Sequence, residues 1–107
     1  MSISKEYEQL IAARENLEGD IDYDRNPVII RMIELLSKDI NATVSFLDEE
    51  CTESQFVWMS EIFDEIVERT KSREFIDALR RTAKKYPQAT AKYNIEYFIE
   101  SAEEYIE

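Results

Sequence analysis

Apolar residues recur along the chain at the spacing of amphipathic helices. The clearest stripe spans residues 52–70, where the recurring positions are Phe56, Met59, Ile62, Phe63, Ile66 and Val67. An earlier stripe consists of Val28, Ile29, Met32, Ile33, Leu36 and Ile40. Because residues three and four apart share one face of a helix, both stripes predict helices with a buried side.

Helix start and stop signals divide the first half of the sequence. A first helix is expected over residues 5–18, between the cap Ser4 and Gly19. Asn26 and Pro27 form a strong start signal for a second helix. Weak helix formers after Ser37 predict a break near residues 37–39, followed by a shorter helix to about residue 47.

Three further helices are expected in the second half. Thr52 and Gln55 match a capping box at the start of a single helix over residues 52–70. Ser72 begins the next helix, and Pro87 ends it. A last helix is expected to run from residue 88 or 94 to residue 106, with Phe98 among its inward positions.

The composition supports a helical fold. The 107 residues include one Gly and two Pro, too few for the many turns of a β-rich domain. A hydrophobic fraction of 44% is sufficient for a core. We therefore expect an all-α protein, with residues 1–107 forming a single compact bundle of five or six antiparallel helices.

The sequence predicts a cytoplasmic location. It contains no apolar stretch near the roughly 18 residues of a membrane span, and its first residues lack the apolar region of a signal peptide. A lone cysteine, Cys51, cannot form an internal disulfide.

The residue types of the chain give little support to catalysis or to metal binding. The absence of histidine removes the commonest general base and the usual zinc ligands. The acidic neighbours of Cys51 disfavour its thiolate. Asp20, Asp22 and Asp24 resemble the opening of a calcium loop, but arginine occupies the positions where that loop needs Gly and Glu. We expect no enzyme activity, no cofactor and no metal.

Charge is distributed unevenly along this acidic chain, whose net charge is -11. Residues 1–68 hold 17 acids and 5 bases, residues 69–92 hold 2 acids and 8 bases, and residues 93–107 hold 5 acids and no base. The basic block could contact nucleic acid, yet the surrounding acids oppose this, and its cations could instead pair with acids of neighbouring helices. We expect neither nucleic-acid nor membrane binding.

The acidic clusters and two aromatic residues suggest a protein-binding surface. Acids around a partly exposed Trp or Tyr resemble a binding hot spot and would attract a basic partner. An alternative is that Trp58 belongs to the core and Tyr23 is an ordinary loop residue. The candidate partner-binding residues are Asp20, Asp22, Tyr23, Asp24, Asp48, Glu49, Glu50, Glu53, Trp58, Glu61, Asp64 and Glu65.

The segment Asp48-Glu49-Glu50-Cys51-Thr52-Glu53-Ser54-Gln55-Phe56-Val57-Trp58-Met59-Ser60-Glu61-Ile62-Phe63-Asp64-Glu65-Ile66 resembles part of the small acidic immunity proteins of bacterial polymorphic-toxin and contact-dependent inhibition systems. The continuation through Ser72-Arg73-Glu74-Phe75 and Lys85-Tyr86-Pro87 is similar as well, so that the resemblance covers roughly residues 45–102. It implies an antitoxin that binds and neutralises a cognate toxin domain, for which we expect a basic nuclease. The alternatives are a helical adaptor or regulator of a housekeeping complex, and an acidic DNA mimic.

Overall fold

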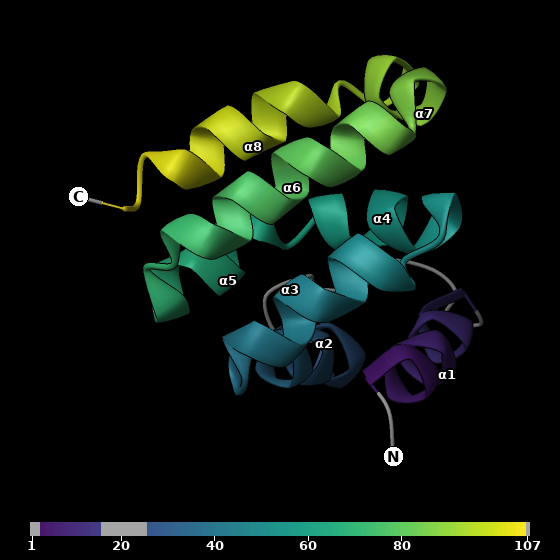
Figure 1. The fold of residues 1–107 in the computed structure, drawn as a ribbon. Helices are drawn as coiled ribbons and strands as arrows, with labels where there is room; N and C mark the ends of the chain where they lie inside the picture. Colours follow the sequence, from purple (N-terminus) through teal and green to yellow (C-terminus); the bar gives the residue numbers. More distant parts are fainter. Residues whose placement is uncertain (1–2, 16–25, 107) are drawn as a thin grey trace.

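Every regular element of the described residues is an α-helix. The computed structural model describes residues 3–15 and 26–106 (Figure 1). Its helices are α1 (Ile3–Glu15), α2 (Pro27–Ser37), α3 (Ile40–Glu49), α4 (Glu53–Ser60), α5 (Phe63–Thr70), α6 (Arg73–Lys85), α7 (Pro87–Lys92) and α8 (Ile95–Glu103). The predicted all-α class is confirmed.

The arrangement differs from the expected bundle of five or six antiparallel helices. The described ranges hold eight helices, because two of the expected helices are each divided in two. Helix α6 lies between α3 and α8 and runs antiparallel to α8, while α5 packs against both α8 and α2, and α1 packs against α2 (Figure 1). Within these ranges, no helix is both long and apolar enough to cross a membrane.

A serine hydroxyl accompanies the division between α4 and α5. The Ser60 hydroxyl donates a hydrogen bond of 2.6 Å to the Val57 carbonyl, which an uninterrupted helix would offer to the amide of Glu61. That amide bonds instead to the Trp58 carbonyl, at 3.4 Å. The apolar stripe stays in phase across this point, so the prediction of a single helix over residues 52–70 was wrong for a local reason.

The division between α7 and α8 falls at Asn94, whose backbone is left-handed with φ 55° and ψ 42°. Asn adopts this conformation more readily than most residues with a side chain. Pro87 occupies the first turn of α7, where its missing N–H costs no hydrogen bond. The two start positions expected for the last helix, residues 88 and 94, therefore lie close to the starts of α7 and α8.

The caps predicted at Asn26, Thr52 and Ser72 are present, whereas the cap predicted at Ser4 was wrong, because α1 already begins at Ile3. The Asn26 side chain accepts hydrogen bonds from the amides of the first turn of α2, and the Ser72 hydroxyl does the same for α6. The predicted break near residues 37–39 is confirmed, and Asp39 caps the new helix α3. The capping box of Thr52 and Gln55 is also confirmed, with both reciprocal bonds formed.

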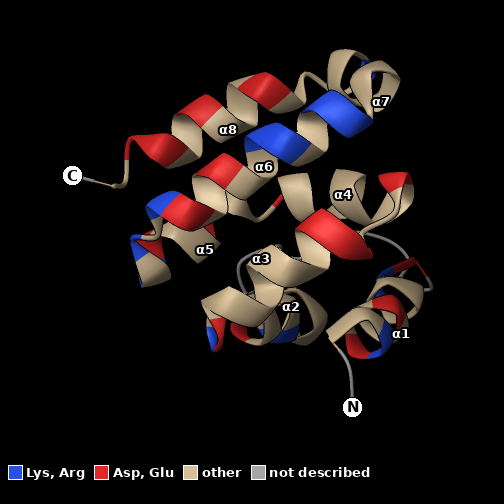
Figure 2. Cartoon of the chain, in the orientation of Figure 1, with Lys and Arg blue, Asp and Glu red and all other residues tan. Residues whose placement is uncertain are grey.

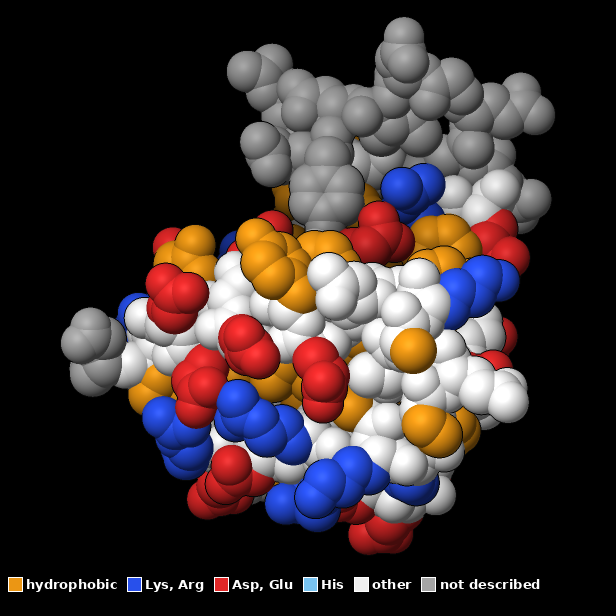
Figure 3. All heavy atoms as spheres, turned by 90° about the horizontal axis from the view of Figure 1, so that it is seen from above, with side chains coloured by type: hydrophobic (Ala, Val, Ile, Leu, Met, Phe, Trp, Pro, Cys, Tyr) orange, Lys and Arg blue, Asp and Glu red, His pale blue; other side chains and the backbone are white. Residues whose placement is uncertain are grey.

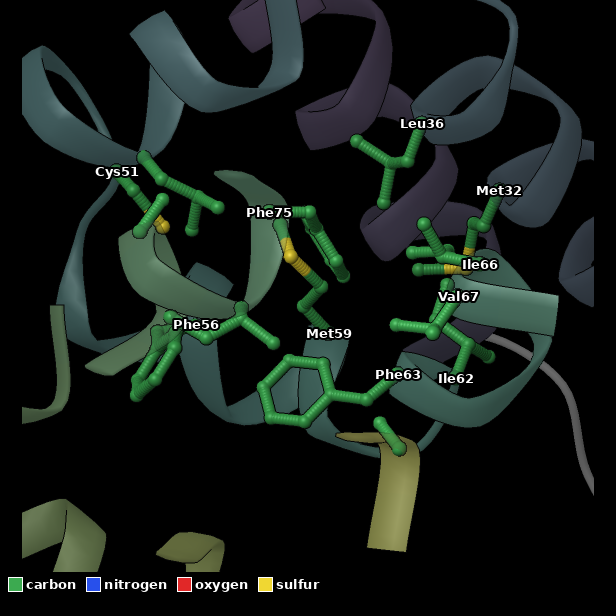
Figure 4. Packing of buried hydrophobic residues seen from close by; sticks show 14 of the residues in the cluster. Met32, Leu36, Cys51, Phe56, Met59, Ile62, Phe63, Ile66, Val67 and Phe75 are labelled. Carbon is green, nitrogen blue, oxygen red and sulfur yellow. The ribbon is translucent and has the colours of Figure 1, made fainter. Parts of the chain in front are cut away.

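Aromatic rings join α4, α5 and α6 at the centre of the core. The Phe63 ring lies 5.8 Å from the Phe56 ring and 6.4 Å from the Phe75 ring, measured between centroids. Figure 4 shows these rings beside Met59, together with aliphatic side chains from α2 and α5. One continuous apolar cluster thus joins helices α1 through α6 and α8.

Tyr7 attaches α1 to this core through a ring contact and a hydrogen bond. Its ring is nearly perpendicular to that of Phe46, with 5.9 Å between the ring centroids, and its hydroxyl donates a hydrogen bond of 2.8 Å to the backbone carbonyl of Gln55. The side chain is fully buried, and burial is the largest cause that raises its pKa well above the ordinary value. The phenol is therefore retained in its neutral form in the folded protein.

We expect Tyr7→Phe to lower the free energy of unfolding by about 1 kcal/mol at neutral pH. Above about pH 10 the unfolded native chain releases its phenol proton while the folded chain retains it, so that the native protein loses stability with rising pH. The phenylalanine variant lacks this loss, and the difference between the two proteins should shrink. Urea unfolding across this pH range measures it; a constant difference would contradict the assignment.

Candidate functional site

A groove lies between α4, α7 and the start of α8. Its volume is about 730 Å³. Its apolar lining consists of Val57, Trp58, Ala89, Tyr93 and Phe98, and its charged lining of Glu53, Glu61 and Lys92. A groove of this size, partly aromatic and open along one side, is suited to a side chain or a short segment of a partner.

Local sequence signals position the α4 wall. The capping box at Thr52 begins α4 and places the Glu53 carboxylate in the first turn. Gln55 is buried behind this turn, and its amide donates a hydrogen bond of 2.6 Å to the carboxylate of Glu8 on α1. The start of α4 is therefore fixed to α1, and its outer side forms the groove.

Trp58 is half-buried and belongs both to the core and to the groove. Its indole packs against the buried cluster, while it also lines the groove. The guanidinium carbon of Arg14 lies 5.7 Å from the ring centroid, a cation–π contact that joins the end of α1 to α4. This contact explains why a charged residue interrupts the apolar face of α1. The two predicted roles of Trp58 are thus both compatible with its position.

The opposite wall carries exposed aromatic side chains. Tyr93 is 45% exposed and Phe98 is 38% exposed, and the Lys92 ammonium lies 5.3 Å from the centroid of the Tyr93 ring. Phe98 also contacts the ring of Tyr97, which is 61% exposed. The expectation that Phe98 points inward was wrong: the side of α8 that packs into the core carries Ile95, Ile99 and Ala102, and Phe98 lies at its exposed edge.

Partial burial raises the pKa of two acidic residues, Glu61 and Asp64. Burial is the largest cause that raises the pKa of Glu61, and the nearby Arg14 opposes it. Burial also raises the pKa of Asp64, which accepts a hydrogen bond of 3.3 Å from the Ser101 hydroxyl on α8. The two carboxylates occupy different places: Glu61 lines the groove, whereas Asp64 lies at the contact of α5 with α8.

The predicted binding residues therefore separate into groups. Glu53, Trp58 and Glu61 meet in the groove. Asp48, Glu49 and Glu50 lie at the end of α3, and Asp64 and Glu65 lie on α5. Asp20, Asp22, Tyr23 and Asp24 lie outside the described residues. Sequence reasoning missed Tyr93 and Phe98; aromatic residues clustered around Asn94 were the available signal.

Arg81 engages Asp48, one of the predicted binding residues. The Arg81 guanidinium binds the carboxylate through two hydrogen bonds, of 3.0 Å and 2.9 Å. The hydrogen bond from Arg81 is the largest cause that lowers the pKa of Asp48. Lys85 adds a bond of 2.9 Å to the backbone carbonyl of Asp48. This carboxylate therefore holds α3 against α6 in the unbound chain.

Other cations of the basic block, residues 69–92, also form ion pairs with acidic residues of neighbouring helices. Arg73 and Arg80 both bind the carboxylate of Glu103 on α8, with a distance of 2.7 Å from Arg80. Figure 2 shows the basic residues of α6 beside the acidic residues of α8. Hydrogen bonds from Arg80 and then Arg73 lower the pKa of Glu103 to about 2. Among the predicted roles of the block, pairing between helices is the one that these contacts support.

We expect Glu103→Gln to remove a stabilising contribution that depends on pH. The folded pKa of about 2 lies below the ordinary value of 4.5, so the contribution is present above pH 4.5 and lost as the pH falls toward 2. The difference in urea midpoint between native and variant proteins should therefore decrease across this acidic range. A difference that stays unchanged over the same interval would contradict the ion-pair assignment.

Cys51 is buried, and the pKa of its thiol is raised for a different reason from the one expected. Burial raises the pKa of Cys51 to about 12, while Lys85 opposes the shift. The predicted direction is right, but desolvation takes the place of the acidic neighbours as its main cause. Among the described residues, no three acidic or cysteine side chains are grouped to hold a metal ion.

Comparisons of the chain with protein families, curated proteins and solved structures found no match. The resemblance to immunity proteins therefore stays a prediction, and the groove and its charges provide the basis for a functional proposal.

Proposed function

We propose that this chain is an immunity protein, a non-catalytic inhibitor that binds and neutralises a basic toxin domain of the nuclease class. The observation that carries the proposal is the groove in which Trp58, Tyr93 and Phe98 lie beside the carboxylates of Glu53 and Glu61. Aromatic side chains of this kind supply much of the energy of protein interfaces, and nearby carboxylates favour a basic partner.

The charge of the whole chain supports the same partner. A net charge of -11 accelerates the encounter with a basic domain and opposes the binding of nucleic acid. In the bound state, carboxylates of the inhibitor would occupy positions that nucleic-acid phosphates take on a nuclease. We further propose that the chain acts in the cytoplasm, as a single helical domain.

The test begins with capture of partners by the tagged chain from its own cells at low and high ionic strength. The captured protein is then expressed in a host cell with and without the chain. We expect a basic protein that is lost at high salt, arrests growth when expressed alone, and permits growth when the chain is present. A captured protein that leaves growth unaffected would overturn the immunity function.

A helical adaptor of a housekeeping complex is the second candidate, and the apolar part of the groove favours it. Such an adaptor would bind through Val57, Trp58 and Phe98 with little contribution from charge. Its complex should resist high salt, and its partner should not inhibit growth. The two readouts of the capture experiment therefore separate this candidate from the immunity protein.

A further inference from the structure

Two aromatic rings of the groove already contact cations of the same chain. The Arg14 guanidinium lies over Trp58, and the Lys92 ammonium lies over Tyr93. A cation within about 6 Å of a ring centroid is attracted by the negative face of the ring. The groove is thus built from rings whose surroundings suit a positive charge.

Carboxylates flank the central ring on the α4 wall. Glu53 lies in the first turn of α4, and Glu61 follows its last residue, so the two are separated by roughly 12 Å along the helix axis. Trp58 lies between them in the sequence, and all three residues line the groove. A cation that enters the groove would therefore find both an aromatic ring and carboxylates in its lining.

We propose that the groove receives an arginine side chain of the basic partner, between Trp58 and Phe98 and beside the carboxylate of Glu53. This inference rests on the proposed function and names the contact that the partner makes. Arginine fits better than lysine because its planar guanidinium stacks on aromatic rings, binds carboxylates through paired hydrogen bonds and is less strongly hydrated. Because Arg14 already lies over the Trp58 ring and Lys92 over the Tyr93 ring, we expect the incoming guanidinium to contact chiefly Phe98 and Glu53.

Charge complementarity distinguishes this occupant from others. A second copy of the chain would bring another net charge of -11, and an acidic peptide or a nucleic acid would also be repelled. Figure 3 shows hydrophobic side chains in the upper part of one face of the molecule, while acidic and basic side chains alternate at its lower left. Within the groove itself, apolar side chains lie together with the carboxylates of Glu53 and Glu61, a combination that suits a basic segment of a partner.

Trp58 provides a direct measurement, since the chain contains one tryptophan. The probe is a short amphipathic peptide with several arginines, and its counterparts carry lysine or neutral citrulline in their place. We expect the arginine peptide to change Trp58 fluorescence in a saturable manner, the lysine peptide to bind more weakly, and the citrulline peptide to bind least. Equal binding of the arginine and citrulline peptides would overturn the inference.

Matched variants separate the groove from the overall charge. Glu53→Gln and Glu74→Gln remove the same charge from the first turn of two different helices, and only Glu53 lines the groove. Phe98→Ser and Tyr105→Ser alter two aromatic residues with similar exposure, 38% and 39%, and only Phe98 lines the groove. We expect about tenfold weaker peptide binding for the groove variants and little change for the controls.

Equal weakening by Glu53→Gln and Glu74→Gln would mean general attraction by the acidic chain, and would overturn the inference. Urea midpoints of all four variants establish that each is folded before binding is compared.

The failure of this inference can be distinguished from the failure of the proposed function. Suppose that Glu53→Gln and Phe98→Ser protect cells from the captured toxin as well as the native chain and bind it equally tightly. The arginine contact is then wrong, while the immunity function stands. If the peptide results hold but the captured partner does not arrest growth, the function is wrong and the groove remains an arginine site.

Discussion

Phe63→Ala is expected to lower the free energy of unfolding by about 3–5 kcal/mol. The Phe63 ring is fully buried and contacts the rings of Phe56 and Phe75, so its removal leaves a cavity where α4, α5 and α6 meet. Domains of this size are stable by only about 5–15 kcal/mol, so the loss is a large fraction of the total.

Urea unfolding followed by circular dichroism and Trp58 fluorescence measures this loss. Phe98→Ala removes the same kind of side chain from an exposed position and should cost no more than about 1 kcal/mol. Should the alanine variant fail to fold, Phe63→Leu keeps most of the apolar volume and permits a measurement. Equal losses at positions 63 and 98 would contradict the placement of Phe63 in the core.

The second large effect concerns binding. We expect Trp58→Ala to weaken the complex with the captured partner by roughly 30-fold or more, the effect of a hot-spot residue that contributes about 2 kcal/mol. The loss should appear mainly as faster dissociation, because contacts within an interface act chiefly on the off-rate. Calorimetry and surface-plasmon resonance with the purified partner measure affinity and rate.

Trp58 also packs against the core, so a structural loss has to be separated from a binding loss. Trp58→Phe retains an aromatic ring and should keep more of the affinity than alanine does. Tyr105→Ala serves as a control, since it removes an exposed ring that does not line the groove. If Trp58→Ala folds normally and binds as tightly as the native chain, the groove is not the partner site.

Local capping chemistry made much of the fold predictable. The side chains of Asn26 and Thr52 accept hydrogen bonds from amides of the helix that follows, and Pro27 and Gln55 complete these start signals. A few adjacent residues are therefore enough to predict where each helix begins. The break after Ser37 could also be predicted, because the residues that follow it have low helix propensity.

The missed helix ends lacked such signals. At Ser60 the apolar stripe continues without interruption, and the break involves a hydroxyl that binds the Val57 carbonyl, an option that serine leaves open in many intact helices. At Asn94 a left-handed residue without glycine separates α7 from α8. Neither event alters the hydrophobic period from which helices are predicted.

The candidate site was less predictable than the fold because it combines distant segments. Glu53, Trp58 and Glu61 share one helix region and could be selected together from the sequence. Their pairing with Tyr93 and Phe98 depends on how α7 and α8 pack against α4, which local patterns do not specify. Likewise, the neutralisation of Asp48 by Arg81 requires the packing of α3 on α6.

In the groove walls, the residues that pack into the core differ from those that point outward, and this difference has a consequence for evolutionary change. In α4, Phe56 and Met59 carry the packing, whereas Glu53 projects outward; in α8, Ile95 and Ile99 carry it, whereas Phe98 is exposed. Substitutions at the outward positions therefore remove little buried surface and leave the folded state populated. The proposed recognition residues at these outward positions, Glu53 and Phe98, can therefore be replaced one at a time at little cost to the fold.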